Sequence, residues 1–265
     1  MALDSGNARR QRDLALANAD VGYAQEREGD LAAALESYRR TLSIFDGLAR
    51  SDPKNSDLQG SLAAAHNDVG HVLKRQSKFE DALKSYREAL AILENHDAGA
   101  SADPQWQRQL AAEYGLIGDV VDEQRHPQEA LVSYREGLAI IDRLVKADPG
   151  NTELQKRFAI CVQQIGSVAY YGLMARDFTT ALEAADQAIA LAPDQLWLST
   201  NRAHALMFLN HIDEARALYL KYRGRTLQDG KRWEAVILED FADLRKAGLT
   251  NPLMDEIQKL FASAG

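Results

Sequence analysis

One line of sequence recurs three times at a fixed interval, and this repeat constrains the fold more than any other feature. The segments LESYRRTLSIF, LKSYREALAIL and LVSYREGLAII begin at Leu35, Leu83 and Leu131, each 48 residues after the last. Four glycines keep the same interval, at Gly22, Gly70, Gly118 and Gly166. Repeats of this length are typical of a solenoid, in which each unit packs only against its neighbours.

Each unit predicts two helices joined by a short turn. In the second unit, apolar residues at helical spacing predict a first helix from about Asp57 to Gln76. A second helix is expected from about Glu80, with Leu83 and Tyr86 on its apolar face. The 265 residues contain six prolines and lack clusters of strand-forming residues, so we expect an all-α chain throughout.

The repeated positions resemble those of a known family. Gly70, Ala82 twelve residues later and Tyr86 sixteen residues later are similar to the tetratricopeptide repeat, whose usual period is about 34 residues. The resemblance covers about residues 4 to 224 and implies a right-handed superhelical solenoid of helical hairpins. The longer period is similar to tandem arrays of bacterial multidomain proteins, where such repeats often follow an effector domain.

Two domains follow from this pattern. Residues 4–224 would form about five hairpins, of which the first three to four have long helices, and the spacing becomes that of an ordinary repeat from Ala181 onward. Residues 225–265 leave the repeat and predict a C-terminal helical cap, with one helix from about Trp233, a stop at Gly248 and a second helix opened by Pro252. The turn-like DSGN at residues 4–7 matches the later inter-repeat turns, which suggests a fragment of a longer protein.

Composition excludes several classes of function. The net charge of −8 is spread along the chain without a Lys/Arg block, so nucleic acid is not an expected partner. No segment approaches 18 consecutive apolar residues and no signal peptide is evident, so a membrane is not expected either. The single Cys161 needs no oxidising compartment, and a cytoplasmic location is the expectation.

No catalytic, metal or cofactor motif stands out. The segment GRTLQDGKR, residues 224–232, has five residues between its glycines and an arginine where a phosphate-binding loop needs Ser or Thr. His66 and His71 lie five apart, a poor spacing for two ligands on one helix face. Asp119, Asp122 and Glu123 share a face, which a solvated or partner-facing charge patch explains better than acid–base catalysis. We therefore expect no enzyme, cofactor or metal.

The resemblance also implies where a partner binds, because the first helix of each hairpin lines the concave surface of tetratricopeptide arrays. The corresponding positions vary between units while the packing positions repeat, which indicates either a specialised binding face or an unconstrained surface. The candidate residues are Tyr23, Glu26, Asn67, His71, Lys74, Asp119, Asp122, Gln163, Ser167 and Tyr170. The set lacks the Lys, Asn and Arg pattern of the carboxylate clamp that some such domains use for chaperone C-termini.

The sequence thus predicts a non-enzymatic scaffold that holds a protein or peptide segment in the concave groove, with basic groups of the partner against Asp119 and Asp122. The alternative is a regulatory or sensor array of a larger bacterial effector or signalling protein whose N-terminal domain is absent here. Self-association through the N-terminal repeat also stays open. The identity of the partner is unknown from the sequence.

Overall fold

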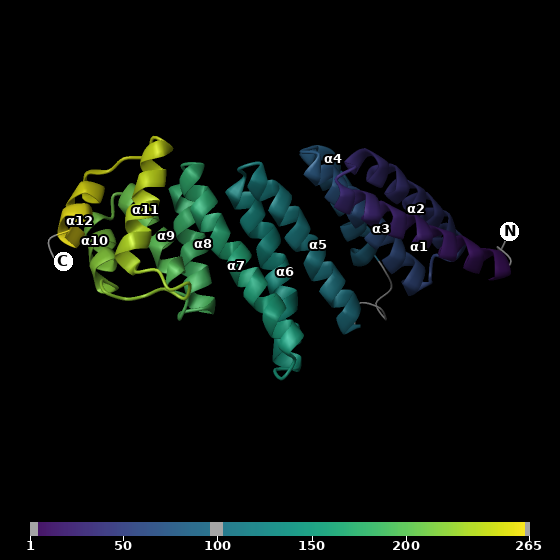
Figure 1. Cartoon of the computed structure of the whole chain (residues 1–265). Helices are drawn as coiled ribbons and strands as arrows, with labels where there is room; N and C mark the ends of the chain where they lie inside the picture. Colours follow the sequence, from purple (N-terminus) through teal and green to yellow (C-terminus); the bar gives the residue numbers. More distant parts are fainter. Residues whose placement is uncertain (1–4, 96–102, 263–265) are drawn as a thin grey trace. The chain divides into compact units, whose positions relative to one another are not determined.

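The computed structural model describes residues 5–95 and 103–262, so residue 4, the predicted start of the repeats, lies outside the described residues. Within these ranges the regular structure is helical, apart from one isolated bridge between Thr226 and Arg232. The helices, labelled in Figure 1, are α1 Ser5–Glu28, α2 Leu31–Ser51, α3 Ser56–Arg75, α4 Phe79–Glu94, α5 Pro104–Glu123, α6 Pro127–Ala147, α7 Thr152–Met174, α8 Phe178–Leu191, α9 Trp197–Phe208, α10 Ile212–Lys221, α11 Trp233–Lys246 and α12 Pro252–Ala262.

The chain divides into two compact units, which are described separately. The first comprises residues 1–120 with 136–154, and the second comprises residues 121–135 with 155–265. The first unit holds α1 to α4 with most of α5, and the second holds α7 to α12. None of the described helices combines the length and the apolar character that crossing a bilayer requires.

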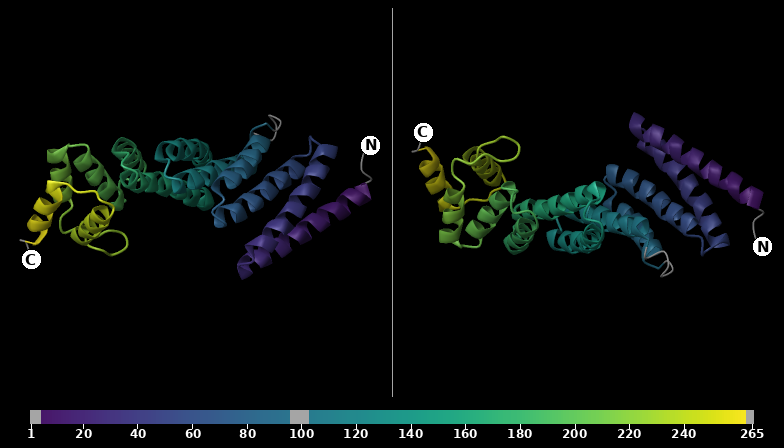
Figure 2. Two further views of the ribbon diagram at one scale, coloured as in Figure 1. Left: turned by 90° about the horizontal axis from the view of Figure 1, so that it is seen from above. Right: turned by 90° about the horizontal axis from the view of Figure 1, so that it is seen from below.

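Two antiparallel hairpins open the first unit. Helix α1 packs against α2, α2 against α3 and α3 against α4, as the purple and blue helices of Figures 1 and 2 show. The observed bounds of α3 and the start of α4 agree with the predicted helices to within one residue. Leu62 and Ala65 of α3 join Phe45 and Leu48 of α2 in one apolar cluster, which buries the interface between the hairpins.

Two of the repeated glycines, Gly22 and Gly70, provide room for the repeated tyrosines of their own hairpins. A Cβ placed on Gly70 would lie 2.7 Å from Cε1 of Tyr86, and one on Gly22 would lie 2.9 Å from Cδ1 of Tyr38. Both rings are almost fully buried. The glycine therefore costs about 1 kcal/mol in helix propensity but lets an aromatic ring reach the helix backbone within the same hairpin.

The turns inside the hairpins share one geometry. A residue one or two positions after the first helix has positive φ, at Gly29 (86°), Ser77 (59°), Arg125 (64°), Arg176 (64°) and Asn210 (65°). At each turn two backbone N–H groups donate to carbonyls of the preceding helical turn, for example Ser77 N to Lys74 O and Lys78 N to Leu73 O. This is the Schellman pattern that ends many helices with a left-handed residue.

Aromatic side chains fill the C-terminal part of the second unit. Tyr219 of α10 and Trp233, Ile237 and Phe241 of α11 are fully buried in one cluster. Trp233 Nε1 donates to the carbonyl of Tyr219 over 2.8 Å. The observed α11 and α12 match the two helices predicted for the tail, with Gly248 at φ 72° between them.

Candidate partner-binding surfaces

The ten predicted binding residues divide between the two units. Tyr23 and Glu26 lie on α1, Asn67, His71 and Lys74 on α3, and Asp119 on α5, all within the first unit. Asp122, near the end of α5, and Gln163, Ser167 and Tyr170 of α7 belong to the second unit. Each unit therefore presents its own candidate surface, and the role of these residues in binding stays a prediction.

Neighbouring residues on the first helices face opposite environments. Tyr23 is 58% exposed, although Gly22 beside it is buried against Tyr38. His71 is exposed beside buried Gly70 in the same way. In these two hairpins the repeated position points into the hairpin and the unrepeated position that follows it points to solvent, whereas Asp119 and Ser167, at the same position of the next two, are only half-exposed.

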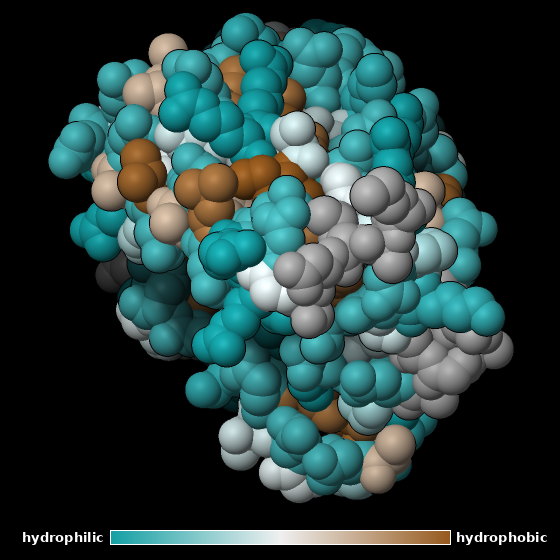
Figure 3. Space-filling view, turned by 90° about the vertical axis from the view of Figure 1, so that its right-hand side faces the viewer, coloured by the Kyte–Doolittle hydropathy of each residue, from teal (hydrophilic) through white to brown (hydrophobic). Residues whose placement is uncertain are grey.

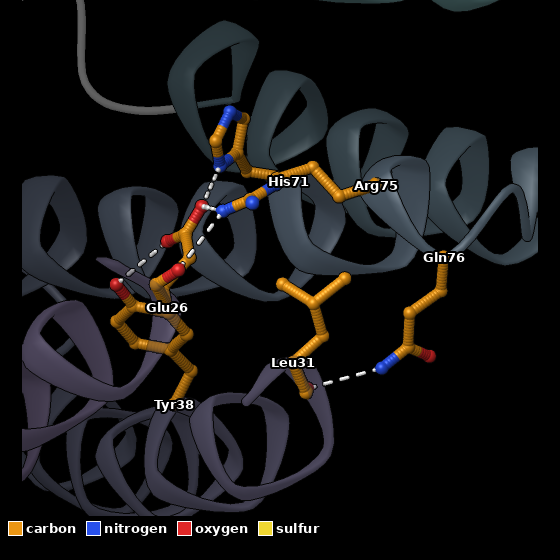
Figure 4. Close-up of polar contacts among 6 residues, drawn as sticks. All are labelled: Glu26, Leu31, Tyr38, His71, Arg75 and Gln76. Atoms are coloured by element: carbon orange, nitrogen blue, oxygen red, sulfur yellow. Dashed lines mark hydrogen bonds and ion pairs between the residues drawn. The ribbon is translucent and has the colours of Figure 1, made fainter. Parts of the chain in front are cut away.

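Glu26 does not lie open on this surface, because it joins the first hairpin to the second (Figure 4). Arg75 Nη1 donates to Glu26 Oε1 over 2.8 Å, and His71 Nδ1 lies 2.9 Å from the same oxygen. Tyr38 donates its hydroxyl to Glu26 Oε2 over 3.2 Å. With Glu26 only 8% exposed, these contacts use its carboxylate to connect α1, α2 and α3.

The charge of Glu26 is stabilised in this network. Burial by itself raises the pKa of the carboxyl, but the hydrogen bond from Arg75, the charge of His71 and the hydrogen bond from Tyr38 lower it further than burial raises it. Next to this group, Gln76 Nε2 donates to the carbonyl of Leu31 over 3.0 Å, a second polar contact between the same hairpins (Figure 4).

A second buried carboxyl lies between α3 and α5. Glu113 is 2% exposed, and Asn67 Nδ2 donates to its Oε1. Burial raises the pKa of Glu113 to about 7, although the hydrogen bond from Asn67 opposes this rise. Burial and the charge of Glu26 raise the pKa of nearby Asp68 to about 6. Asn67, a predicted surface residue, therefore also contacts a buried group, the carboxyl of Glu113.

The predicted acidic patch is only partly on the surface. Asp122 is 4% exposed and Asp119 is half-buried, whereas Glu123 is exposed. Burial of Asp122 was not expected from the sequence. A basic group of a partner could reach its carboxylate only after the surrounding helices rearranged.

The second unit presents an aromatic surface. Tyr170 and Tyr171 of α7 are 38% and 44% exposed, and their rings meet edge to face with centroids 5.6 Å apart at 74°. Burial and the negative charges of Asp243 and Asp240 raise the pKa of Tyr170. The sequence analysis missed Tyr171 and these two aspartates. The doubled tyrosine was a visible signal, but the aspartates on α11 lie about 70 residues away in sequence.

An apolar groove lies next to Gln163. It encloses about 530 Å³ and is lined mainly by α7 and by the segment from the end of α8 to the start of α9, including Phe158, Val162, Leu191 and Trp197. Such a groove accommodates an apolar side chain, and Gln163 places an amide at its edge.

The described residues offer little for catalysis. They contain no group of three His, Cys, Asp or Glu side chains placed to hold a metal ion. Burial raises the pKa of the half-buried Cys161 thiol to about 11, so it is protonated at neutral pH and a poor nucleophile. His66 lies 3.1 Å from Glu88 Oε2, and burial lowers its pKa although the charge of Glu88 opposes this. His66 is thus a half-buried side chain paired with Glu88 inside the hairpin.

No curated protein sequence matches the chain. Residues 173–237 match the family model of the tetratricopeptide repeat, and this segment lies where the sequence predicts a change to ordinary repeat spacing. Three solved structures illustrate the similarity in fold. BtubC (BKLC) from P. vanneervenii is 19% identical with a TM-score of 0.54, covering 88% of this chain and 87% of its own.

The other two structures are similar over comparable lengths. The nearly identical TPR-like repeats of a putative kinesin light chain from Podosopora anserina are 15% identical with a TM-score of 0.54, covering 80% of this chain and 93% of theirs. MamA is 15% identical with a TM-score of 0.50, covering 90% of this chain and 97% of its own. At these identities the likeness shows the fold, an all-α solenoid of helical hairpins of the tetratricopeptide type, as predicted.

Proposed function

The chain carries tetratricopeptide repeats over residues 173–237 and has the fold of tetratricopeptide-repeat proteins, and from this premise we propose that it is a non-enzymatic scaffold that binds a protein or peptide segment. Binding takes place on the concave face formed by the first helices of the hairpins. A cytoplasmic location belongs to the same proposal, since the single Cys161 needs no oxidising compartment.

The pairing of a buried repeated residue with an exposed unrepeated one carries this proposal. Gly22 and Gly70 are buried and hold the tyrosines of their hairpins, whereas Tyr23 and His71, directly after them, are exposed. The scaffold residues therefore stay constant while the surface residues change from one hairpin to the next. A binding protein built from repeats uses this arrangement because specificity can vary without loss of stability.

The surface of the second unit suits a positively charged side chain of the partner. Tyr170 and Tyr171 offer two exposed aromatic faces, and Asp240 and Asp243 supply negative charge nearby. An Arg or Lys side chain placed over such a ring is attracted by about 0.5 to 2 kcal/mol. The proposed partner thus presents at least one basic side chain to this unit, beside an apolar side chain for the groove at Val162.

Helices α11 and α12 act as the C-terminal cap in this proposal. Trp233, Ile237 and Phe241 cover the apolar side of α9 and α10, and α12 adds Leu253, Met254 and Ile257 to the same cluster. The other face of α12 carries Asp255, Glu256 and Lys259, which are polar as the outer surface of a cap must be. The right-handed superhelical sense remains an implication of the family resemblance.

Paired affinity captures test the proposal. One bait is the chain itself, and the other carries Tyr23→Ala, His71→Ala, Lys74→Ala and Tyr170→Ala together. A control bait carries Arg40→Ala, Lys84→Ala and Arg87→Ala, exposed residues of the second helices. We expect a protein that the native and control baits retain and the first variant loses, with equal helicity of all three by circular dichroism. A purified candidate must then bind the native chain directly.

Equal capture by all baits would contradict binding through the concave face. The regulatory alternative, in which these helices contact another domain of a longer protein, would then need a different surface. A captured protein lost equally from the control bait would instead indicate nonspecific charge effects.

A further inference from the structure

Helix α1 carries an apolar stripe that no part of the described chain covers. Its large members are Leu14 and Val21, 56% and 49% exposed, and Ala17 and Ala24 between and beyond them are exposed too. These four residues follow at intervals of three and four, which places them along one helix face. In the space-filling view toward the N-terminal end, apolar residues gather in a patch among hydrophilic ones (Figure 3).

The equivalent residues of the next hairpin show that this stripe is a packing surface. The same four positions in the next hairpin, 48 residues later, are Leu62, Ala65, Val69 and Val72, and they are 8%, 1%, 5% and 0% exposed. Leu62 and Ala65 are buried by Phe45 and Leu48 of α2, a helix of the preceding hairpin. The stripe of α1 is therefore the surface that this fold buries against another helix, here left exposed.

The stripe is complementary to a second copy of itself. Arg10 and Glu28 extend it by one step at either end, and both are exposed. If two α1 helices lie antiparallel about Ala19, Leu14 meets the partner's Ala24, and Val21 meets the partner's Ala17. Arg10 then meets the partner's Glu28. Each large apolar side chain faces a small one and each charge faces its opposite, as interdigitated packing requires.

We propose that a second copy of this chain docks antiparallel on the α1 stripe and forms a dimer with two-fold symmetry. A two-fold axis lets one surface serve both subunits. A head-to-tail contact between the α1 stripe and α12 is disfavoured, because the outward residues of α12 include Asp255, Glu256 and Lys259 and do not match an apolar stripe. The inference does not rest on the proposed concave-face function, because the stripe and Tyr23 occupy different faces of α1.

The area of the contact between the two α1 stripes, here called the seam, sets the expected affinity. A helix of 24 residues is about 36 Å long, and a seam about 10 Å wide buries roughly 360 Å² per copy. The total of about 700 Å² is below the usual 1,200 to 2,000 Å² of stable interfaces, so we expect a reversible dimer with a Kd in the micromolar range.

One flank of the seam limits the affinity. Asp20 is exposed and lies beside the stripe, close to the level of the proposed axis. The two-fold axis keeps the two Asp20 side chains on the same flank, so they lie near each other. Two like charges across the axis repel, whereas Asp13 on the same flank approaches the partner's Arg27 and is attracted. Asp20→Asn should therefore lower the Kd, by about two- to fivefold.

Sedimentation velocity over a dilution series from about 1 to about 300 µM tests the dimer, since this range brackets a micromolar Kd. We expect a monomer–dimer equilibrium for the native chain. Leu14→Glu with Val21→Glu should raise the Kd at least tenfold, since it would bury charges in the seam. Leu16→Glu is the matched control, because Leu16 is equally exposed on α1, at 49%, but lies off the stripe. Circular dichroism confirms that each variant folds.

A charge exchange tests the antiparallel register. Arg10→Glu and Glu28→Arg should each weaken the dimer, since each places like charges opposite one another, and the double exchange should restore it. A chain that is monomeric throughout the series overturns the proposal. So does a dimer that Leu14→Glu with Val21→Glu leaves unchanged, or that Leu16→Glu weakens as much. A double exchange that stays weak overturns the antiparallel pairing.

Discussion

The two units join their hairpins by different means. In the first unit, carboxyls lie between the hairpins: Glu26 contacts Arg75 and His71, and Glu113 accepts from Asn67. In the second unit, the aromatic rings of Tyr219 and Trp233 are fully buried in the apolar cluster. Its polar contacts include the indole of Trp233, which donates to the Tyr219 carbonyl, and buried His204, which lies 2.8 Å from the Tyr219 hydroxyl and 3.1 Å from Asp240 Oδ2. The comparison teaches that one fold tolerates junctions built mainly on carboxyls or mainly on aromatic rings. The carboxyls of the first unit have shifted pKa values, so they make stability depend on pH.

Loss of the indole in the second unit should have the largest effect. Trp233→Ala removes a fully buried ring and leaves the carbonyl of Tyr219 without its donor. We expect a loss of about 3 to 5 kcal/mol in the free energy of unfolding, measured by urea denaturation. Val132→Ala, at a side chain 51% exposed, is the control and should change the value by less than about 0.5 kcal/mol. A loss below about 1 kcal/mol for Trp233→Ala would show that the aromatic junction of the second unit contributes little to stability.

Replacing the buried carboxyl of the first unit should stabilise the chain, whereas Trp233→Ala destabilises it. Because the pKa of Glu113 is raised to about 7 in the folded state, its ionisation opposes folding, and stability falls as pH rises from about 4.5 through 7. Glu113→Gln keeps an acceptor for Asn67 and removes this charge. We expect it to stabilise the chain at pH 8 by as much as about 3 kcal/mol and to change little at pH 4.5. Equal effects at both pH values would contradict a neutral Glu113 in the fold.

The glycine beneath a repeated tyrosine can be compared with a glycine that touches nothing. Gly70→Ala would place a methyl group 2.7 Å from the Tyr86 ring and should destabilise the chain by about 1 to 3 kcal/mol. Gly47 lies in α2 with no atom within 4 Å of an added Cβ. Gly47→Ala should therefore stabilise the chain by about 0.5 to 1 kcal/mol. Thermal unfolding of the two variants checks the opposite signs, and a shared sign would remove the steric explanation.

The smallest of these effects concerns Glu26. Its pKa is lowered in the folded state, so its contribution to stability is present above about pH 4.5 and is lost as pH falls through the folded value. Glu26→Gln should cost about 1 kcal/mol at pH 7, since Arg75 is 43% exposed and partly screened by solvent. It should also flatten the loss of stability below pH 4.5. An acid transition identical to that of the native chain would exclude Glu26 as a contributor.

Much of the fold could be read from the repeat. The interval of the SYR line predicted helices close to the observed α3 and α4, and the all-α solenoid of hairpins is confirmed. Local chemistry explains the success, because Asp30 and Asn55 accept from backbone N–H groups of their own helices. The two tail helices were predicted from the apolar spacing after Trp233, the stop at Gly248 and Pro252 at the start of the second helix, and the structure has both helices.

Less of the candidate surfaces could be read in this way. The family resemblance placed Tyr23 and His71 on the candidate face, and both are exposed. The same register also placed Glu26 and Asp122 there, and both are buried. A period places a residue on a face of a helix and does not say what covers that face. Asp240 and Asp243, whose charges raise the pKa of Tyr170, were missed because α11 lies near α7 only in the folded chain.

The sequence alone determined which residues repeat, hence the hairpins, their turns and the small residues under the tyrosines, because these depend on contacts within one hairpin. Only the tertiary structure decided how deeply each of the equivalent positions in successive repeats is buried. Val69 and Val21 occupy the same place in their helices, yet α2 helps to bury the first and nothing in the described chain covers the second. The physical reason is that burial, and with it the pKa of Glu113, depends on neighbours that the periodicity of a single helix does not specify.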